Sequence, residues 1–75
     1  SLSQLSRLIK QNTGSTFKEL LQKKRLNKAV QLLVETKLSV SDIIAGVGYD
    51  NASYFFRIFK ERYGMSPKEY RSGRV

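Results

Sequence analysis

A basic and apolar phrase occurs twice in this chain, and the repeat restricts the folds that the chain can adopt. RLIKQNTG at residues 7–14 is matched by RIFKERYG at residues 57–64, an offset of 57 − 7 = 50 residues. The match extends in both directions as S-x-[LF]-x-R-[LI]-[IF]-K-x-x-x-G-x-[ST]-x-K-E. A repeat at constant offset indicates a duplicated supersecondary unit, and two copies are too few for a solenoid.

Glycines and capping residues divide the chain into helices. Residues 1–14 form an amphipathic segment that ends at Gly14, where a left-handed residue is favoured. Thr16 and Glu19 form a capping-box pattern that opens a long helix over residues 16–37. The apolar stripe of the first segment is Leu2, Leu5, Leu8 and Ile9, and that of the long helix is Phe17, Leu20, Leu21, Ala29, Leu32 and Leu33.

Residues 39–64 have the pattern of two short helices joined by a turn. Ser39 caps the first of them with Asp42 as its partner, and Gly48 ends it. Asn51 caps the second, which runs from Ala52 to Tyr63. The buried side of the first is expected to be Ile43, Ile44 and Val47. On the second, Phe55, Ile58 and Phe59 share the core-facing side with either Arg62 or Tyr63.

A final helix over residues 66–72 begins with Ser66-Pro67, because proline is tolerated at the first helical position. No segment has the alternating pattern of a strand. The sequence therefore predicts an all-α fold, with residues 1–75 forming one small domain or part of one.

The charge of the chain favours a polyanionic partner. Fourteen Lys and Arg residues against six Asp and Glu residues give a net charge of +8. Such an excess favours nucleic acid first and an anionic membrane surface second, with a solubilising surface as the simpler alternative. The membrane reading is weak because the basic residues do not oppose one broad apolar face, and no run is long enough to span a bilayer.

The residue types argue against enzymatic and metal chemistry. The chain has no Cys and no His, which removes thiolate nucleophiles, imidazole bases and the usual zinc ligands. Its few scattered carboxylates form no recognisable acid–base set. We expect no enzyme activity, no cofactor and no metal, and the absence of Cys is consistent with a cytoplasmic protein.

The outward face of the Ala52–Tyr63 helix is the predicted DNA-contacting surface. In a helix-turn-helix unit the second helix enters the major groove. Arg57 can pair with guanine, Asn51 and Ser53 can reach base edges or phosphate, and Lys60 suits phosphate. Phe56 has two readings: it contacts a thymine methyl, or it covers the edge of the core.

The repeat predicts a second recognition helix in residues 1–14. At the offset of fifty, the counterparts of the outward face are Ser3, Ser6, Arg7 and Lys10. Gln4 lies beside them, and glutamine is a residue type that can pair with adenine. The helix that should precede this one would fall before residue 1, so the first unit is expected to be incomplete. An alternative is that the Leu5, Leu8 and Ile9 stripe serves a protein partner or self-association.

The long helix would separate the two recognition helices by about 30 Å, which is close to the ~34 Å turn of B-DNA. The two helices could then enter successive major grooves. Its basic run Lys23-Lys24-Arg25, with Lys28, is either a solvated face or a contact with DNA backbone or an acidic protein. Arg25 lies near the apolar stripe and could instead tie this helix to the flanking ones.

These residues resemble the DNA-binding domain of the AraC/XylS family of bacterial transcription regulators. RLNKAVQLL resembles the family pattern Arg-Leu-x-x-Ala-x-x-Leu-Leu, and SVSDIIAGVGYDNASYFFRIFKERYGMSPKEYR resembles the family signature almost throughout. The resemblance covers nearly the whole chain. Two departures are Ile44, where the family usually has a small residue, and Ile9, where Phe is common.

The resemblance implies two homeodomain-like helix-turn-helix units joined by a linker helix, with about two N-terminal helices of the family domain absent here. It implies sequence-specific binding of double-stranded DNA by a bacterial, nucleoid-associated regulator, often an activator that also touches RNA polymerase. The base-reading positions of the family fall on Ser3, Gln4, Ser6 and Arg7, and on Ala52, Ser53, Phe56 and Arg57. Lys10 and Lys60 are the expected backbone contacts.

Overall fold

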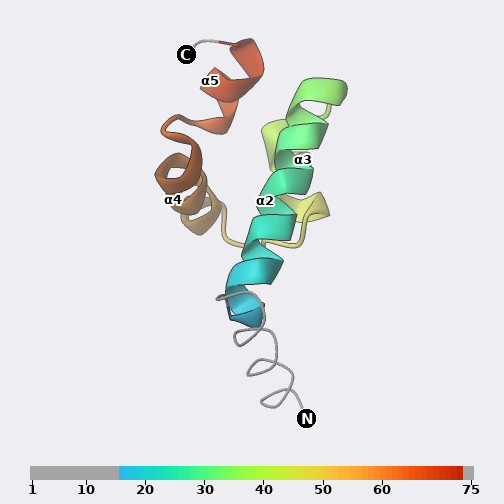
Figure 1. Cartoon of the computed structure of the whole chain (residues 1–75). Coiled ribbons are helices and arrows are strands. Elements are labelled where there is room, and N and C mark those ends of the chain that lie inside the picture. Colours follow the sequence, from blue (N-terminus) through green and yellow to red (C-terminus); the bar gives the residue numbers. More distant parts are fainter. Residues whose placement is uncertain (1–15, 74–75) are drawn as a thin grey trace.

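Helices are the regular secondary structure of the described part of the chain. The computed structural model describes residues 16–73, and this region contains no strand, which confirms the predicted all-α class. The segment expected to form a first recognition helix, residues 1–14, lies outside the described residues. Figure 1 shows a long helix, α2, with three shorter helices beside it; the four helices are α2 (Phe17–Glu35), α3 (Val40–Gly46), α4 (Ala52–Tyr63) and α5 (Pro67–Ser72).

Each described helix begins where a side chain caps it. The capping box at Thr16 is confirmed: the Glu19 amide donates to the Thr16 hydroxyl oxygen at 3.1 Å, and the Thr16 amide donates back to the Glu19 carboxylate at 3.3 Å. Ser39 and Asn51 accept from the amide three residues later at 3.1 and 3.0 Å, respectively. Ser66 forms a second capping box with Glu69. These bonds satisfy amides that a helix start would otherwise leave unpaired.

The core is formed by one stripe from each of three helices. Six of the residues expected on the buried sides of α3 and α4 are buried, whereas Tyr63 is only partly buried and Arg62 is exposed. The stripe of α2 is only partly as expected: Phe17, Leu20, Leu21 and Leu32 are only partly buried, whereas Leu26, outside the expected stripe, is 1% exposed. The nine buried hydrophobic residues are Leu26, Ala29, Leu33, Ile43, Ile44, Val47, Phe55, Ile58 and Phe59.

The shift along α2 follows from where the other helices pack. Figure 1 shows α3, α4 and α5 gathered around the middle and C-terminal part of α2, while its N-terminal turns extend beyond them. Helical periodicity identifies the buried face of a helix, but the length of that face that becomes covered depends on the partners.

The C-terminal helix is fastened to both α4 and α2. The ring of Tyr70 packs edge-on against Phe59 and Tyr63, with centroids 5.9 and 5.6 Å apart. Arg71 donates from Nε to the Leu33 carbonyl at 3.0 Å and from a terminal nitrogen to the Thr36 carbonyl at 3.3 Å. A cation is well placed there, because the last carbonyls of a helix carry partial negative charge.

The turn between α3 and α4 sets the direction in which α4 leaves. We expected the first helix of the pair to end at Gly48, but α3 ends at Gly46 with Val47 as its C-cap. Gly48 follows with a φ of +103°, a conformation that side chains rarely adopt. A Cβ placed on Gly48 would lie 3.2 Å from Nε of Arg25, so the glycine also allows α2 to approach closely.

Arg25 ties the long helix to this turn. Its guanidinium carbon lies 5.3 Å from the centroid of the Tyr49 ring, a cation–π contact. Burial raises the pKa of the Tyr49 hydroxyl, and the hydrogen bond and positive charge of Arg25 act in the opposite direction. Of the roles left open by the sequence, the structure thus supports the one in which Arg25 joins α2 to its neighbours.

Among residues 16–73, no helix combines the length and the apolar character needed to cross a bilayer.

Adjacent residues of α2 provide a test of the core. Leu33 is 2% exposed and Val34 is 67% exposed. We expect Leu33→Ala to lower the free energy of unfolding by about 2–5 kcal/mol, because it leaves a cavity. Val34→Ala should change it by no more than about 0.5 kcal/mol. Urea denaturation followed by circular dichroism measures both, and equal losses would contradict the packing described.

The glycines of the turn provide a second test. Gly48→Ala should destabilise the fold by about 1–3 kcal/mol, because alanine must adopt a positive φ and crowd Arg25. Gly46→Ala is the matched control: a Cβ there meets nothing within 4 Å, and alanine favours the helix. It should be neutral or stabilising by up to about 1 kcal/mol. Thermal unfolding of the two variants distinguishes them, and a stable Gly48→Ala would refute the turn geometry.

The second capping box should make stability depend on pH. The pKa of Glu69 is lowered, chiefly by the hydrogen bond from the Ser66 amide, at 3.0 Å. Because the folded-state pKa lies below the unfolded value of about 4.3, the stabilisation is complete above that value and is lost as pH falls through the folded pKa. The difference in Tm between the native chain and Glu69→Gln should therefore be largest above about pH 5 and shrink as the pH falls from there toward pH 3. A constant difference would exclude a charged cap.

Candidate nucleic-acid interface

The two faces of α4 have opposite characters. Phe55 and Phe59 are fully buried, and Ile58 is 6% exposed. The side opposite to them is open to solvent and carries two cations with small and aromatic neighbours. This outward face, with the cap and first residue of the helix, consists of Asn51, Ala52, Ser53, Phe56, Arg57 and Lys60, all of which are exposed.

The structure thus brings together all six residues that the sequence predicted in this half of the chain. The stretch from Asn51 to Lys60 contains Arg57 and Lys60 but no Asp or Glu. Glu61 follows directly in the sequence. The face therefore offers a local excess of positive charge to a ligand that approaches α4 from solvent.

Phe56 packs against the core and is also open to solvent, so the structure supports its core-covering role, and contact with a thymine methyl stays a prediction. Its side chain is 44% exposed. Its centroid also lies 6.2 Å from that of the buried Phe55 in an edge-on arrangement. One edge of the ring therefore covers the core, and the remainder is available to an apolar group of a ligand.

Asn51 is partly committed to the fold. Its side-chain oxygen accepts the Tyr54 amide at 3.0 Å, which caps α4. An asparagine amide also carries two N–H donors, and these are not needed for the cap. A hollow of about 330 Å³ lies beside it, lined by Asn51, Ser53, Tyr54 and Arg57.

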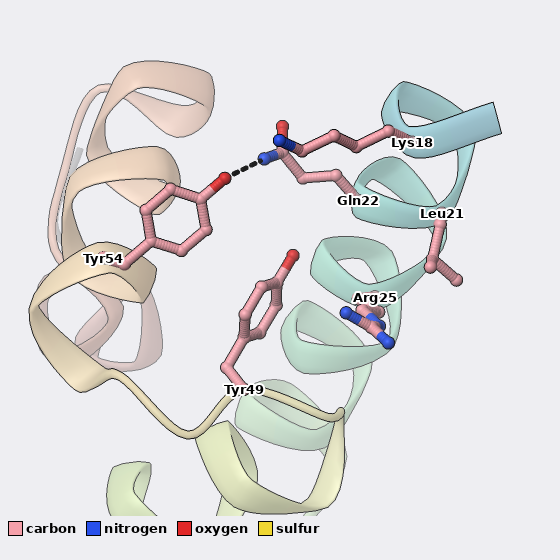
Figure 2. Close-up of a pocket in the computed structure, with 6 residues that line it drawn as sticks. All are labelled: Lys18, Leu21, Gln22, Arg25, Tyr49 and Tyr54. Atoms are coloured by element: carbon pink, nitrogen blue, oxygen red, sulfur yellow. Dashed lines mark hydrogen bonds between the residues drawn. The ribbon is translucent and has the colours of Figure 1, made fainter. Parts of the chain in front are cut away.

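Behind the outward face, a small cavity lies between α4 and α2, and Figure 2 shows the side chains that line it. The cavity has a volume of about 140 Å³, and Gln22 donates from its amide nitrogen to the Tyr54 hydroxyl at 3.0 Å across it. Tyr49 stands between Tyr54 and Arg25 in this view. The lining residues are Lys18, Leu21, Gln22, Arg25, Tyr49 and Tyr54.

Sequence reasoning did not single out Gln22 or Tyr54. The available signal was that Tyr54 lies three residues before Arg57, since side chains at this spacing are neighbours on a helix surface. The guanidinium carbon of Arg57 does lie 5.3 Å from the centroid of the Tyr54 ring. The partner of the tyrosine hydroxyl, 32 residues away on another helix, had no sequence signal.

The predicted sites of the N-terminal segment are outside the described residues. These are Ser3, Gln4, Ser6, Arg7 and Lys10, together with the Leu5, Leu8 and Ile9 stripe proposed for a protein partner. Their roles remain predictions.

Comparison with known proteins gives the same family for the whole chain. A family model described as a helix-turn-helix domain matches residues 1–73. The xylose operon regulatory protein of Escherichia coli strain K12 is 38% identical over 71 residues, which is 95% of this chain and 18% of that protein. The transcriptional activator RhaS of Enterobacter sp. strain 638 is 40% identical over 74 residues, or 99% of this chain and 27% of that protein.

A solved structure agrees with these matches. The C-terminal domain of AraT, a response regulator from Geobacillus stearothermophilus, superposes with a TM-score of 0.90 at 45% sequence identity. The superposition covers 100% of this chain and 62% of that chain. This chain spans between about a fifth and a quarter of the length of the curated relatives named above. The α3–turn–α4 geometry, the family match and the relatives agree, and the chain belongs to the helix-turn-helix domain family of AraC/XylS-type transcriptional regulators.

Proposed function

We propose that this chain binds double-stranded DNA sequence-specifically as part of a bacterial transcriptional regulator, with α4 in the major groove. The observation that carries the proposal is the outward face of α4, which is exposed and cationic while the opposite face is locked into the core. A major groove about 12 Å wide admits one α-helix, and a helix-turn-helix unit presents its second helix to it.

Each residue of this face has a role that fits its chemistry. Arg57 can donate two hydrogen bonds to guanine, and Phe56 can contact a thymine methyl group. Asn51 and Ser53 lie at the start of α4, where recognition helices contact base edges or phosphate. Ala52 permits a close approach, and we assign Lys60 to a phosphate because its flexible ammonium suits a charge contact better than base reading.

We extend the proposal to a second recognition helix in the N-terminal segment, with Ser3, Gln4, Ser6 and Arg7 toward bases and Lys10 toward phosphate. The fifty-residue repeat and the family match to residues 1–73 support it. In this arrangement α2 is the linker between two units. Its 19 residues have a length of about 28 Å, near the ~34 Å spacing of successive major grooves.

The names of the relatives support a role in transcription. RhaS is called a transcriptional activator, and the Escherichia coli relative is called a regulatory protein of an operon. We propose that the protein to which this chain belongs regulates transcription in the same way, as an activator that touches RNA polymerase when bound to DNA. The proposal places it in the bacterial cytoplasm at the nucleoid and assigns it no enzymatic activity.

Substitutions on α4 test the proposal. After in-vitro selection of preferred duplexes with the complete protein, Arg57→Ala should lose about 1–3 kcal/mol of discrimination at one base pair. Lys60→Ala should weaken binding to all duplexes alike and reduce the salt dependence of log K by about one phosphate contact. Fluorescence anisotropy at several salt concentrations measures both effects.

Arg62→Ala is the control for these variants. Arg62 is exposed on the same helix, but its guanidinium lies over Tyr63, 5.7 Å from the ring centroid, rather than on the outward face. The Arg62→Ala variant should discriminate between base pairs as well as the native protein does. Failure of the complete native protein to bind any selected duplex at low salt would refute the function, and an equal loss for Arg57→Ala on every sequence would make that residue a phosphate contact only.

A further inference from the structure

We propose that Tyr54, held by Gln22 of the long helix, is a positioning residue that orients Arg57 for base reading. The inference rests on the proposed function of α4 and adds a residue that does not itself need to touch DNA. If Tyr54 has this role, α2 contributes to sequence discrimination through contacts that lie behind the outward face of α4.

The first step is the contact between Arg57 and Tyr54. Arg57 is exposed, so in the absence of a partner its long side chain would sample many rotamers. Its guanidinium carbon lies 5.3 Å from the centroid of the Tyr54 ring, within the range of a cation–π contact. A planar guanidinium against a ring is restricted in direction, which is what two-point recognition of a guanine requires.

The second step is that the ring is itself held from another helix. Tyr54 is only partly buried, yet Gln22 donates to its hydroxyl oxygen at 3.0 Å. Figure 2 shows this bond crossing from α2 to α4. The ring of Tyr54 packs against the ring of Tyr49, with centroids 6.0 Å apart and planes tilted by 54°.

The third step is that Tyr49 is in turn fixed to α2. The Arg25 guanidinium carbon is 5.3 Å from the Tyr49 centroid. The order Arg57, Tyr54, Tyr49 and Arg25 therefore forms a continuous series of cation–aromatic and aromatic contacts from the outward face to the long helix. Both ends of the Tyr54 side chain, the hydroxyl and the ring, are restrained by contacts that trace back to α2.

The consequence concerns discrimination more than general affinity. Removing the ring leaves the charge of Arg57 in place, so attraction to phosphates persists. What is lost is the restriction of the guanidinium before binding, and the ordering then has to occur at the base edge. We expect the preference for the base pair read by Arg57 to decline, with little change in non-specific binding.

Tyr63 provides a closely matched control. It is also a tyrosine of α4, its hydroxyl donates to Asn27 of α2 at 3.5 Å, and an arginine, Arg62, lies over its ring at 5.7 Å. The arrangement is thus the same in kind, but it lies at the end of α4 and away from the outward face. Any effect of removing a tyrosine that braces α4 on α2 should appear at both positions.

A measurement without DNA tests the positioning itself. In nitrogen-15 relaxation experiments on the complete protein, the Nε–H group of Arg57 should have a higher order parameter in the native chain than in Tyr54→Leu. Tyr54→Phe keeps the ring and loses only the hydroxyl, so it should give an intermediate value. An unchanged order parameter in Tyr54→Leu would overturn the inference whatever the DNA results.

Binding measurements then test whether the positioning matters. Tyr54→Leu should reduce the preference for the base pair identified with Arg57→Ala by about two- to fivefold, the range expected for an exposed cation–π contact, while the salt slope stays unchanged. Gln22→Ala should produce part of the same loss, and combining it with Tyr54→Phe should add little, because both remove one hydrogen bond. Tyr63→Leu should keep the preference.

The outcomes separate this inference from the proposed function. Equal weakening on all duplexes, or the same loss of preference for Tyr63→Leu, would show that Tyr54 only stabilises the fold and would overturn the inference. Full preference in a folded Tyr54→Leu would also overturn it and leave the DNA-binding proposal intact. A native protein without any sequence preference would refute the proposed function, and with it the reading role of Arg57, even if the order parameters behave as expected.

Discussion

The rest of the structure depends on the burial of Phe55 and Phe59. These two rings project from the same side of α4 and are fully buried among residues of the neighbouring helices. A helix of 12 residues with one side fixed in this way has no freedom to rotate about its axis. The direction of Arg57 and Lys60 is therefore a consequence of hydrophobic packing, although neither residue takes part in it.

The long helix supports each of the other three in a different way. Leu26 and its stripe contribute to the common core, where burial from water is the main stabilising term. Arg25 and Gln22 contact the turn and the first turns of α4 through tyrosine side chains. At the other end, the Leu33 carbonyl accepts a hydrogen bond from Arg71 of α5. A small domain with a limited core gains orientation from such specific polar and aromatic contacts.

Local sequence signals predicted the helix starts and the buried faces of the two short helices. Capping bonds join residues three apart, so the capping box of Thr16 with Glu19 could be identified from spacing alone. The core side of α4 followed from the period of its aromatic residues. The buried section of α2 was predicted less well, and Leu26 was overlooked, because periodicity does not indicate where partner helices begin and end.

The sequence by itself determined the all-α class, the family and the set of polar and cationic residues on the outward face of α4. It could do so because caps, helical period and family motifs are local patterns along the chain. Only the tertiary structure decided that Gln22 holds Tyr54, that Tyr54 lies under Arg57, and that Gly48 makes room for Arg25. Two of these contacts join residues more than 20 positions apart, and such partners are selected by how the helices pack rather than by spacing in the sequence.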